Sequence, residues 1–235
     1  MSADSRLQQV LERLRALADP ANLAGMAHFG INTNGSLGIS IPALQRLARE
    51  IGTDHGLALE LWASGIQDAR ILASFIDDPR QVREAQAEAW VRDFNSWDVC
   101  DQVCDLFERT EFAWRKSLEW CGREEEFVKR AGFATLAGLA VHDKAAADAE
   151  FERFFPVLEA QAWDERNFVR KALNWALRNI GKRNLRLNTG AVACARRIAA
   201  QGSRSARWIA ADALRELTAE KTLVRLQRKG AGKSE

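Results

Sequence analysis

The stretch that decides the fold is residues 167–178, whose sequence is NFVRKALNWALR. On a helix with about 3.6 residues per turn, Phe168, Ala172 and Ala176 fall on one side, and Ile180 continues the same line. The pattern predicts a helix with one core face and one basic, amide-rich face. The members of this second face are Asn167, Lys171, Asn174, Trp175, Arg178 and Lys182. Trp175 can pack against a neighbouring helix or stack on a ligand, and the sequence leaves both alternatives open.

The start of this helix has two weak counterparts elsewhere in the chain. Residues 128–131 (VKRA), 169–172 (VRKA) and 206–209 (ARWI) each pair basic residues with Ala and large apolar residues, at intervals of 41 and then 37 residues. A period of about 40 residues is typical of HEAT and armadillo helix pairs. We therefore expect an all-α, HEAT-like helical-repeat α-solenoid with a concave basic surface. The alternative is a helical bundle without repeats.

Nearly all of the chain has the apolar spacing of helices joined by short links. The predicted helices span 4–17, 42–50, 56–63, 67–76, 79–94, 97–108, 110–121, 124–141, 146–160, 166–180, 189–200, 204–217 and 219–228. Residues 30–40, rich in Asn and Gly, are predicted to form a loop. No linker divides the sequence, so we expect one domain over residues 1–228 and a disordered tail over 229–235.

The composition limits the class of protein. The chain has 235 residues, of which 47% are hydrophobic and 28% charged, as in a soluble globular protein. No apolar run reaches the roughly 20 residues of a membrane span, so we expect no membrane partner. Four cysteines without paired spacing are typical of a reduced, cytoplasmic protein rather than a disulfide framework.

The formal net charge of +2 conceals two opposite parts. Residues 1–160 contain 17 Lys and Arg against 26 Asp and Glu, whereas residues 161–235 contain 17 against 6. No acid occurs from Arg166 to Ala211. Such asymmetry favours a polyanionic partner such as nucleic acid. The alternative is that these cations pair with the acidic N-terminal part.

A second Trp lies off the apolar side of its predicted helix. Trp97 and Asp101 are four residues apart and share a face, while Val99, Val103 and Phe107 belong to the apolar side. Asn95 or Ser96 can cap this helix. An Asp in the first turns also suits the helix dipole without any catalytic role. Similarly, Arg130 follows Glu126 by four residues, and a surface ion pair is its simplest role.

Several other chemistries are not indicated. His28, His55 and His142 are far apart, and Cys100 and Cys104 lack a second pair at the spacing of a zinc site. No P-loop, dinucleotide-binding glycine motif or Gly-x-Ser-x-Gly elbow occurs. We therefore expect neither a metal nor a small-molecule cofactor.

Four stretches of the sequence resemble motifs of the AlkD-like DNA alkylation repair glycosylases, a family of HEAT-like repeat proteins. The matching stretches are residues 37–42 (LGISIP), 96–101 (SWDVCD), 127–131 (FVKRA) and 167–178. The resemblance implies that Asp101 is the catalytic carboxylate, that Trp97 and Trp175 are active-site tryptophans, and that Arg130 is the essential arginine. The cysteine-rich helix around Cys100 and the segment 183–188 depart from the family pattern.

The resemblance also implies a reaction and a partner. The family removes N-alkylated purines such as 3-methyladenine and 7-methylguanine from duplex DNA. Because the alkylated base is already cationic, Asp101 has only to stabilise the oxocarbenium-like sugar and place a water. We expect a monomer that binds DNA phosphates in a salt-dependent way. The expected phosphate-binding residues are Lys129, Arg166, Arg170, Lys171, Arg178, Lys182, Arg183 and Arg207.

Three functions remain open from the sequence. The first is a DNA glycosylase that uses Asp101. The second is a non-catalytic HEAT-like module that binds damaged or branched DNA. The third is a protein-interaction scaffold, against which the acid-free basic stretch argues.

Overall fold

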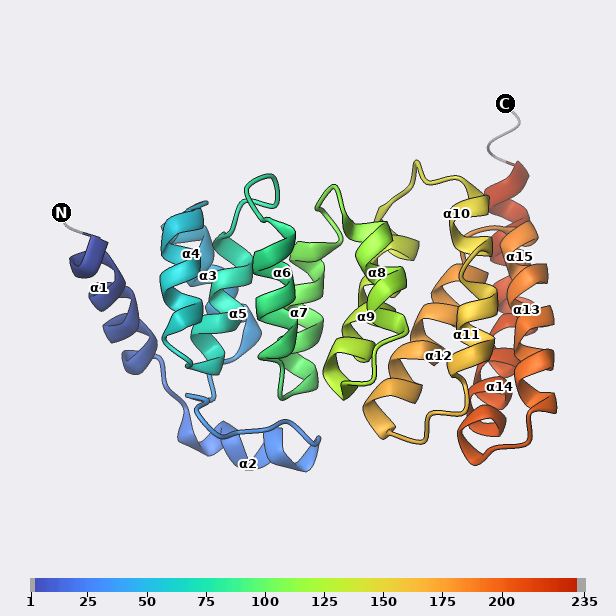
Figure 1. Ribbon diagram of the computed structural model, residues 1–235, viewed down its shortest axis with the longest axis horizontal. Helices are drawn as coiled ribbons and strands as arrows, with labels where there is room; N and C mark the ends of the chain where they lie inside the picture. The colour runs from blue at the N-terminus through green and yellow to red at the C-terminus, as the bar shows by residue number, and fades with distance from the viewer. Residues whose placement is uncertain (1–2, 232–235) are drawn as a thin grey trace. The chain divides into compact units, whose positions relative to one another are not determined.

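The computed structural model describes residues 3–231, and within that part of the chain every regular element is a helix (Figure 1). The expected all-α, HEAT-like helical-repeat class is confirmed. The chain divides into two compact units, unit 1 over residues 1–111 and unit 2 over residues 112–235. The single domain over 1–228 and the concave basic surface stay predictions. Within the described part, no helix is both long and apolar enough to cross a membrane.

Unit 1 is built around α5 (Gln67–Ile76), most of whose residues are buried. It packs against α3 (Ile41–Ile51), α4 (His55–Ala63) and α7 (Trp97–Phe107), and α1 (Ala3–Ala16) contacts α4 and α5. The apolar side predicted for α7 is confirmed, since Val99, Val103, Leu106 and Phe107 are all buried. From α6 (Glu84–Arg92), Trp90 stacks on Trp62 with ring centroids 4.0 Å apart. Aromatic pairs of this kind add about 1 kcal/mol beyond the area they bury.

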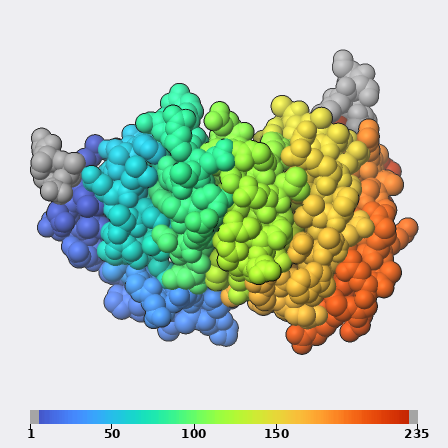
Figure 2. Space-filling view, in the orientation of Figure 1, coloured from blue at the N-terminus to red at the C-terminus, as the bar shows by residue number. Residues whose placement is uncertain are grey.

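The short helix α2 (Pro20–His28) has no buried residue and lies across the ends of other helices in unit 1 (Figure 1). Figure 2 shows it as a ridge along the lower border of this unit as drawn. The sequence did not predict it, because its apolar residues face no core of their own. Asp19 caps its start by accepting from Ala21 N, and Asn22 Nδ2 donates to Gly38 O over 2.9 Å.

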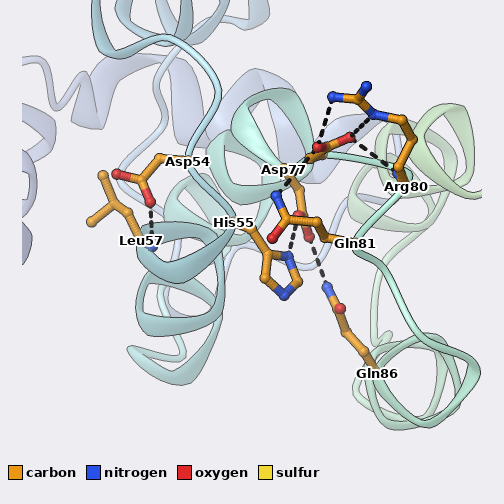
Figure 3. Close-up of polar contacts among 8 residues, drawn as sticks. Asp54, His55, Leu57, Asp77, Arg80, Gln81 and Gln86 are labelled. Atoms are coloured by element: carbon orange, nitrogen blue, oxygen red, sulfur yellow. Dashed lines mark hydrogen bonds and ion pairs between the residues drawn. The ribbon is translucent and has the colours of Figure 1, made fainter.

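A polar cluster joins the end of α5 to the starts of α4 and α6 (Figure 3). His55 Nδ1 lies 2.6 Å from Asp77 Oδ1, and Gln86 Nε2 donates to Asp77 Oδ2 over 2.7 Å. Beside it, Arg80 and Gln81 donate to Asp78. The hydrogen bonds from Arg80 lower the pKa of Asp78 to about 2. The buried Asp77 carboxylate is satisfied on both oxygens, so this cluster fixes three helix ends.

Unit 2 is built around α12 (Asn167–Gly181), which packs on α9 (Glu126–His142), α13 (Leu185–Ala200) and α14 (Arg204–Leu217). Figure 2 shows the helices of this unit packed directly on one another. Its other helices are α8 (Ala113–Cys121), α10 (Asp148–Glu152), α11 (Phe155–Gln161) and α15 (Glu220–Ala231). The three repeated stretches lie in the first two turns of α9, α12 and α14, near the helix starts as predicted.

Helix α9 is rich in Ala and Gly, and it packs closely against α8. A Cβ added to Gly132 would lie 2.4 Å from Cys121 N and 2.8 Å from Trp120 C, both of which are backbone atoms. Only glycine therefore allows this approach, and Ser117 Oγ from α8 uses it to donate to Gly132 O over 2.8 Å.

Several predicted boundaries differ from the structure. The helix predicted over 79–94 begins only at Glu84, because residues 78–83 form the polar turn around Asp78. The helix predicted over 146–160 is two short helices, α10 and α11, and α11 has Pro156 in its first turn. Helix α13 begins four residues earlier than predicted, since Asn184 caps it. Residues 229–231 of the predicted disordered tail are helical, and residues 232–235 lie outside the described part.

Candidate functional site

The start of α7 carries the predicted catalytic pair in unit 1. Ser96 is the N-cap residue in an extended conformation, as predicted, but its side chain makes no capping hydrogen bond. Its buried hydroxyl instead donates to Asp98 and accepts from Asn32 N over 3.1 Å. Ser96 therefore ties the first turn of α7 to the loop of residues 30–40.

Trp97 and Asp101 lie one turn apart on α7, and both side chains are half-buried. The indole of Trp97 has a defined orientation, because its Nε1 donates to Phe29 O over 3.2 Å. Phe29 itself is 71% exposed. The pair predicted from the sequence is thus brought to one face of unit 1, beside the C-terminal end of α2.

A second carboxylate near this face is that of Asp98. Burial raises the pKa of Asp98 above that of an ordinary carboxyl group, and the nearby charge of Asp68 acts in the same direction. The hydrogen bond from Ser96 opposes this shift without cancelling it. Asp98 is bound to Ser96, whereas the family resemblance implies the charge-stabilising role for Asp101.

The loop of residues 30–40 is held on α5 by a residue that sequence reasoning missed. Asp68 is buried, and its carboxylate accepts from Ser36 Oγ, from Leu37 N over 2.6 Å and from Ile39 N over 2.9 Å. Gly38 adopts φ +75°, and a Cβ there would lie 2.3 Å from Asp19 O. The one sequence signal was an acid next to residues 69–76, which are mainly apolar, since a buried acid needs hydrogen-bond donors.

In unit 2, Arg130 is not the surface residue that its spacing from Glu126 suggested. It is only 6% exposed, and its Nη1 donates to Phe168 O over 2.7 Å. The rings of Phe127 and Phe168 stack beside it with centroids 5.7 Å apart. Arg130 thus joins the first turns of α9 and α12.

Lys129 is equally enclosed. Its side chain is 5% exposed, and its Nζ lies 3.2 Å from Asp164 Oδ2 and 2.8 Å from Gln161 Oε1. Asp164 also accepts from Arg166. Burial alone would raise the pKa of Asp164, but the hydrogen bonds from Arg166 and Lys129 outweigh it and hold that pKa below the ordinary value.

The basic face predicted for α12 is largely paired with α14. Asn174 is buried and donates to Asp212 over 2.6 Å. Arg178 and Lys182 lie 2.7 and 3.0 Å from the carboxylate of Glu216. Although burial opposes the shift, these cations lower the pKa of Glu216. The part of this face from Asn174 onward is therefore an interface between helices of one unit, whereas Asn167 and Lys171 at its start are exposed.

Trp175 also makes its contacts within unit 2. It is half-buried and packs against the core cluster of unit 2. Of the two alternatives that the sequence left open, packing within the unit is observed. Its role as an active-site tryptophan stays a prediction of the resemblance.

The remaining predicted phosphate-binding residues are spread over different environments. Arg183 is half-buried, donates to Ala140 O over 2.8 Å and lies over the ring of Phe151. Lys171 and Arg207 are exposed, and Arg170 lies over the ring of Trp208. Within the described residues, no ion pair joins Lys171, Arg170 or Arg207 to a carboxylate. These three cations are the best placed of the predicted set to meet an anion.

The acid-free basic stretch is thus only partly available to a partner. Most of its charged members pair with carboxylates of unit 2 itself, at Glu152, Glu159, Asp164, Glu165, Asp212 and Glu216. Over the residues that can be described, no cluster of His, Cys, Asp and Glu has the composition to hold a metal ion.

Helical repeats of this arrangement define a HEAT-like repeat protein. The family model described as "DNA alkylation repair enzyme" matches residues 10–221, and the chain belongs to that family. Among solved structures, the chain is similar to one described as "A new family of proteins related to the HEAT-like repeat DNA glycosylases with affinity for branched DNA structures". The TM-score is 0.73 at 21% identity, over 81% of this chain and 82% of that one. No curated protein matches the sequence.

Proposed function

We propose that this protein is a DNA glycosylase that excises N-alkylated, cationic purines such as 3-methyladenine and 7-methylguanine from duplex DNA. The observation that carries the proposal is the placement of Asp101 one turn from Trp97 on α7, in a chain whose family is that of DNA alkylation repair enzymes. The indole of Trp97 is oriented by the carbonyl of Phe29.

The chemistry needs little more than one carboxylate. As the C1′–N bond breaks, its electron pair neutralises the positive charge of the alkylated base, so the leaving group requires no proton. The sugar becomes oxocarbenium-like, and the negative charge of Asp101 stabilises it. A water then adds to C1′ and gives a proton to Asp101, which leaves an abasic sugar. Trp97 contributes a π face to the developing cation.

The decisive experiment measures base release. The protein, in excess over a duplex that carries one 7-methylguanine, is incubated and the free base is quantified by mass spectrometry. We expect release by the wild type and a loss of at least about 100-fold in Asp101→Asn, because the stabilising charge is gone. Asp105→Asn, one turn further along α7, is the matched control and should retain the wild-type rate.

Binding is measured in parallel by fluorescence anisotropy with the same duplex. Binding without any release by the wild type would overturn the proposal. Release that survives in Asp101→Asn would move the catalytic charge to another group, and Asp98→Asn would then be assayed. The roles of Arg130 and Trp175 in the reaction rest on the family resemblance. Arg130→Ala and Trp175→Ala test these roles in the same assay.

A second function is favoured by one finding. The solved structure to which the chain is similar is described as having affinity for branched DNA. A non-catalytic module of this kind would bind a four-way junction or a flap more tightly than an intact duplex and would release no base. Competition between these DNAs separates the two functions.

A further inference from the structure

The first turns of α9, α12 and α14 lie at one edge of unit 2, which we call the helix-start edge (Figure 1). Arg166, before α12, donates from Nη1 to Glu124 O over 2.7 Å, beside the start of α9. Glu165 accepts from Ser205 N over 2.9 Å and from Arg204 Nε over 3.1 Å, at the start of α14. The segment of residues 163–166 thus connects three helix starts.

Two large aromatic side chains are exposed at this edge. Trp163 is 58% exposed and directly precedes Asp164, and Trp208 is 37% exposed in the second turn of α14. Tryptophan is highly buried on average, so two exposed indoles on one edge call for a partner. Neither residue belongs to the motifs that carry the family resemblance.

Each indole is held against a cation. Lys129 Nζ lies 5.4 Å from the ring centroid of Trp163, and Arg170 Cζ lies 5.1 Å from that of Trp208. These distances are in the range of cation–π contacts, which orient the ring. Lys129 is itself fixed by Asp164, so the ring of Trp163 rests on a rigid support.

The surroundings of the two rings suit a polyanion. Residues 163–171 and 203–208 contain five cations and two carboxylates, and residues 123–130 at the start of α9 add three cations and three carboxylates, of which Glu125 is paired with Arg123. Of the first two carboxylates, Asp164 is buried between Lys129 and Arg166, and Glu165 is paired with Arg204. Lys171 and Arg207, which neighbour Arg170 and Trp208 in the sequence, are exposed. Aromatic rings interleaved with cations are the arrangement that binds single-stranded nucleic acid, in which bases stack and phosphates are neutralised.

We propose that Trp163 and Trp208 form a stacking surface for unpaired bases of DNA, and that the helix-start edge thereby favours DNA with a single-stranded segment over an intact duplex. The inference rests on the DNA-binding part of the proposed function and needs no catalysis. Bases inside a duplex already stack on their neighbours, so only unpaired bases can use the indoles. A flap, a gap or a branch point provides such bases beside a duplex.

The test compares three DNAs by fluorescence anisotropy at fixed salt: a 20-nucleotide oligo(dT), a duplex with a single-stranded flap, and a blunt duplex. We expect the double variant Trp163→Ala/Trp208→Ala to bind oligo(dT) more weakly than the wild type, by at least about fivefold for each base that no longer stacks on an indole. The flap duplex should lose its advantage over the blunt duplex, whose affinity should change less than about twofold. Leu185→Ala, an exposed apolar residue at the start of α13, is the control.

Two further variants separate stacking from apolar contact and from misfolding. Trp163→Phe/Trp208→Phe keeps an aromatic face and should restore most of the oligo(dT) affinity, whereas the corresponding double Leu variant should not. Circular dichroism and thermal melting verify that each variant is folded, which the exposure of both residues leads us to expect.

Three outcomes would overturn the inference. They are a wild type that does not bind oligo(dT), an affinity for oligo(dT) that the double Ala variant retains, and an equal loss on the flap and blunt duplexes. The second outcome would mean that the indoles do not stack on the bases. The 7-methylguanine assay distinguishes failure of this inference from failure of the proposed glycosylase. If only the stacking surface is wrong, base release remains. If only the glycosylase is wrong, Trp-dependent binding of oligo(dT) remains.

Discussion

Replacement of Asp164 by Ala should destabilise unit 2 more than any change to an exposed ion pair. The carboxylate is 2% exposed and accepts from Lys129 Nζ, from Arg166 Nε over 2.9 Å and from Arg166 N over 3.1 Å. Without it, the buried Nζ of Lys129 keeps Gln161 Oε1 as a hydrogen-bond partner but has no carboxylate beside it. Removal of one partner of a buried pair costs about 3–5 kcal/mol.

Thermal unfolding followed by circular dichroism measures this effect. At roughly 2–4 °C per kcal/mol, a cost of about 3 kcal/mol lowers Tm by roughly 6–12 °C. Glu150→Ala, which breaks an exposed pair with Arg153, is the control and should cost less than about 1 kcal/mol. In Asp164→Ala/Lys129→Met no buried charge is left unpaired, so part of the loss should be regained.

Two results would refute this reasoning. One is a Tm of Asp164→Ala within about 2 °C of that of the wild type, since the cited cost predicts a larger fall. The other is a double variant that melts below Asp164→Ala, because an unpaired ammonium group would then not be the source of the loss.

Three other predictions follow from the same geometry. Lys171→Ala should lower the slope of log Kd against log salt for duplex DNA by about 0.9, whereas Arg183→Ala should lower Tm and leave the slope unchanged; equal slopes in both would contradict the difference in their exposure. The folded-state pKa values of Asp164 and Glu216 are lowered, so their stabilisation is present above pH about 4–5 and is lost as the pH falls toward those values; a Tm that stays flat from pH 6 to pH 3 would oppose this. Gly132→Ala should lower the free energy of unfolding by about 1–3 kcal/mol in urea titrations, because its Cβ meets backbone; a gain in stability, as helix propensity alone would give, would show that α8 can move aside.

The helical class and the faces of the longest helices could be predicted because helix periodicity is a local signal. Positions 128, 169 and 206, found as weak repeats, lie in the first turns of three helices that meet at one edge. The pairing of Trp97 with Asp101 on α7 followed from their spacing alone. Helix α2 was not predicted, because it has no buried face and its apolar residues therefore need not follow the helical period.

The environment of the cations could not be predicted, because it depends on residues that are distant in the sequence. Lys129 is neutralised by Asp164, 35 residues away. Arg178 meets Glu216 at a separation of 38 residues, and Arg183 is held by the carbonyl of Ala140, 43 residues earlier. A count of charges along the chain registers none of these contacts. It therefore overstated the part of the basic stretch that a ligand can reach.

The four cysteines of the chain are all buried, two in each unit: Cys100 and Cys104 in unit 1, Cys121 and Cys194 in unit 2. Burial also raises the pKa of Cys121 and of Cys194, which further suppresses the reactive thiolate. Alkylation of each thiol therefore reports when its surroundings open. Peptide mapping after a pulse of maleimide would time the opening of the two units separately, with no engineered label, and would show whether DNA closes one unit before the other.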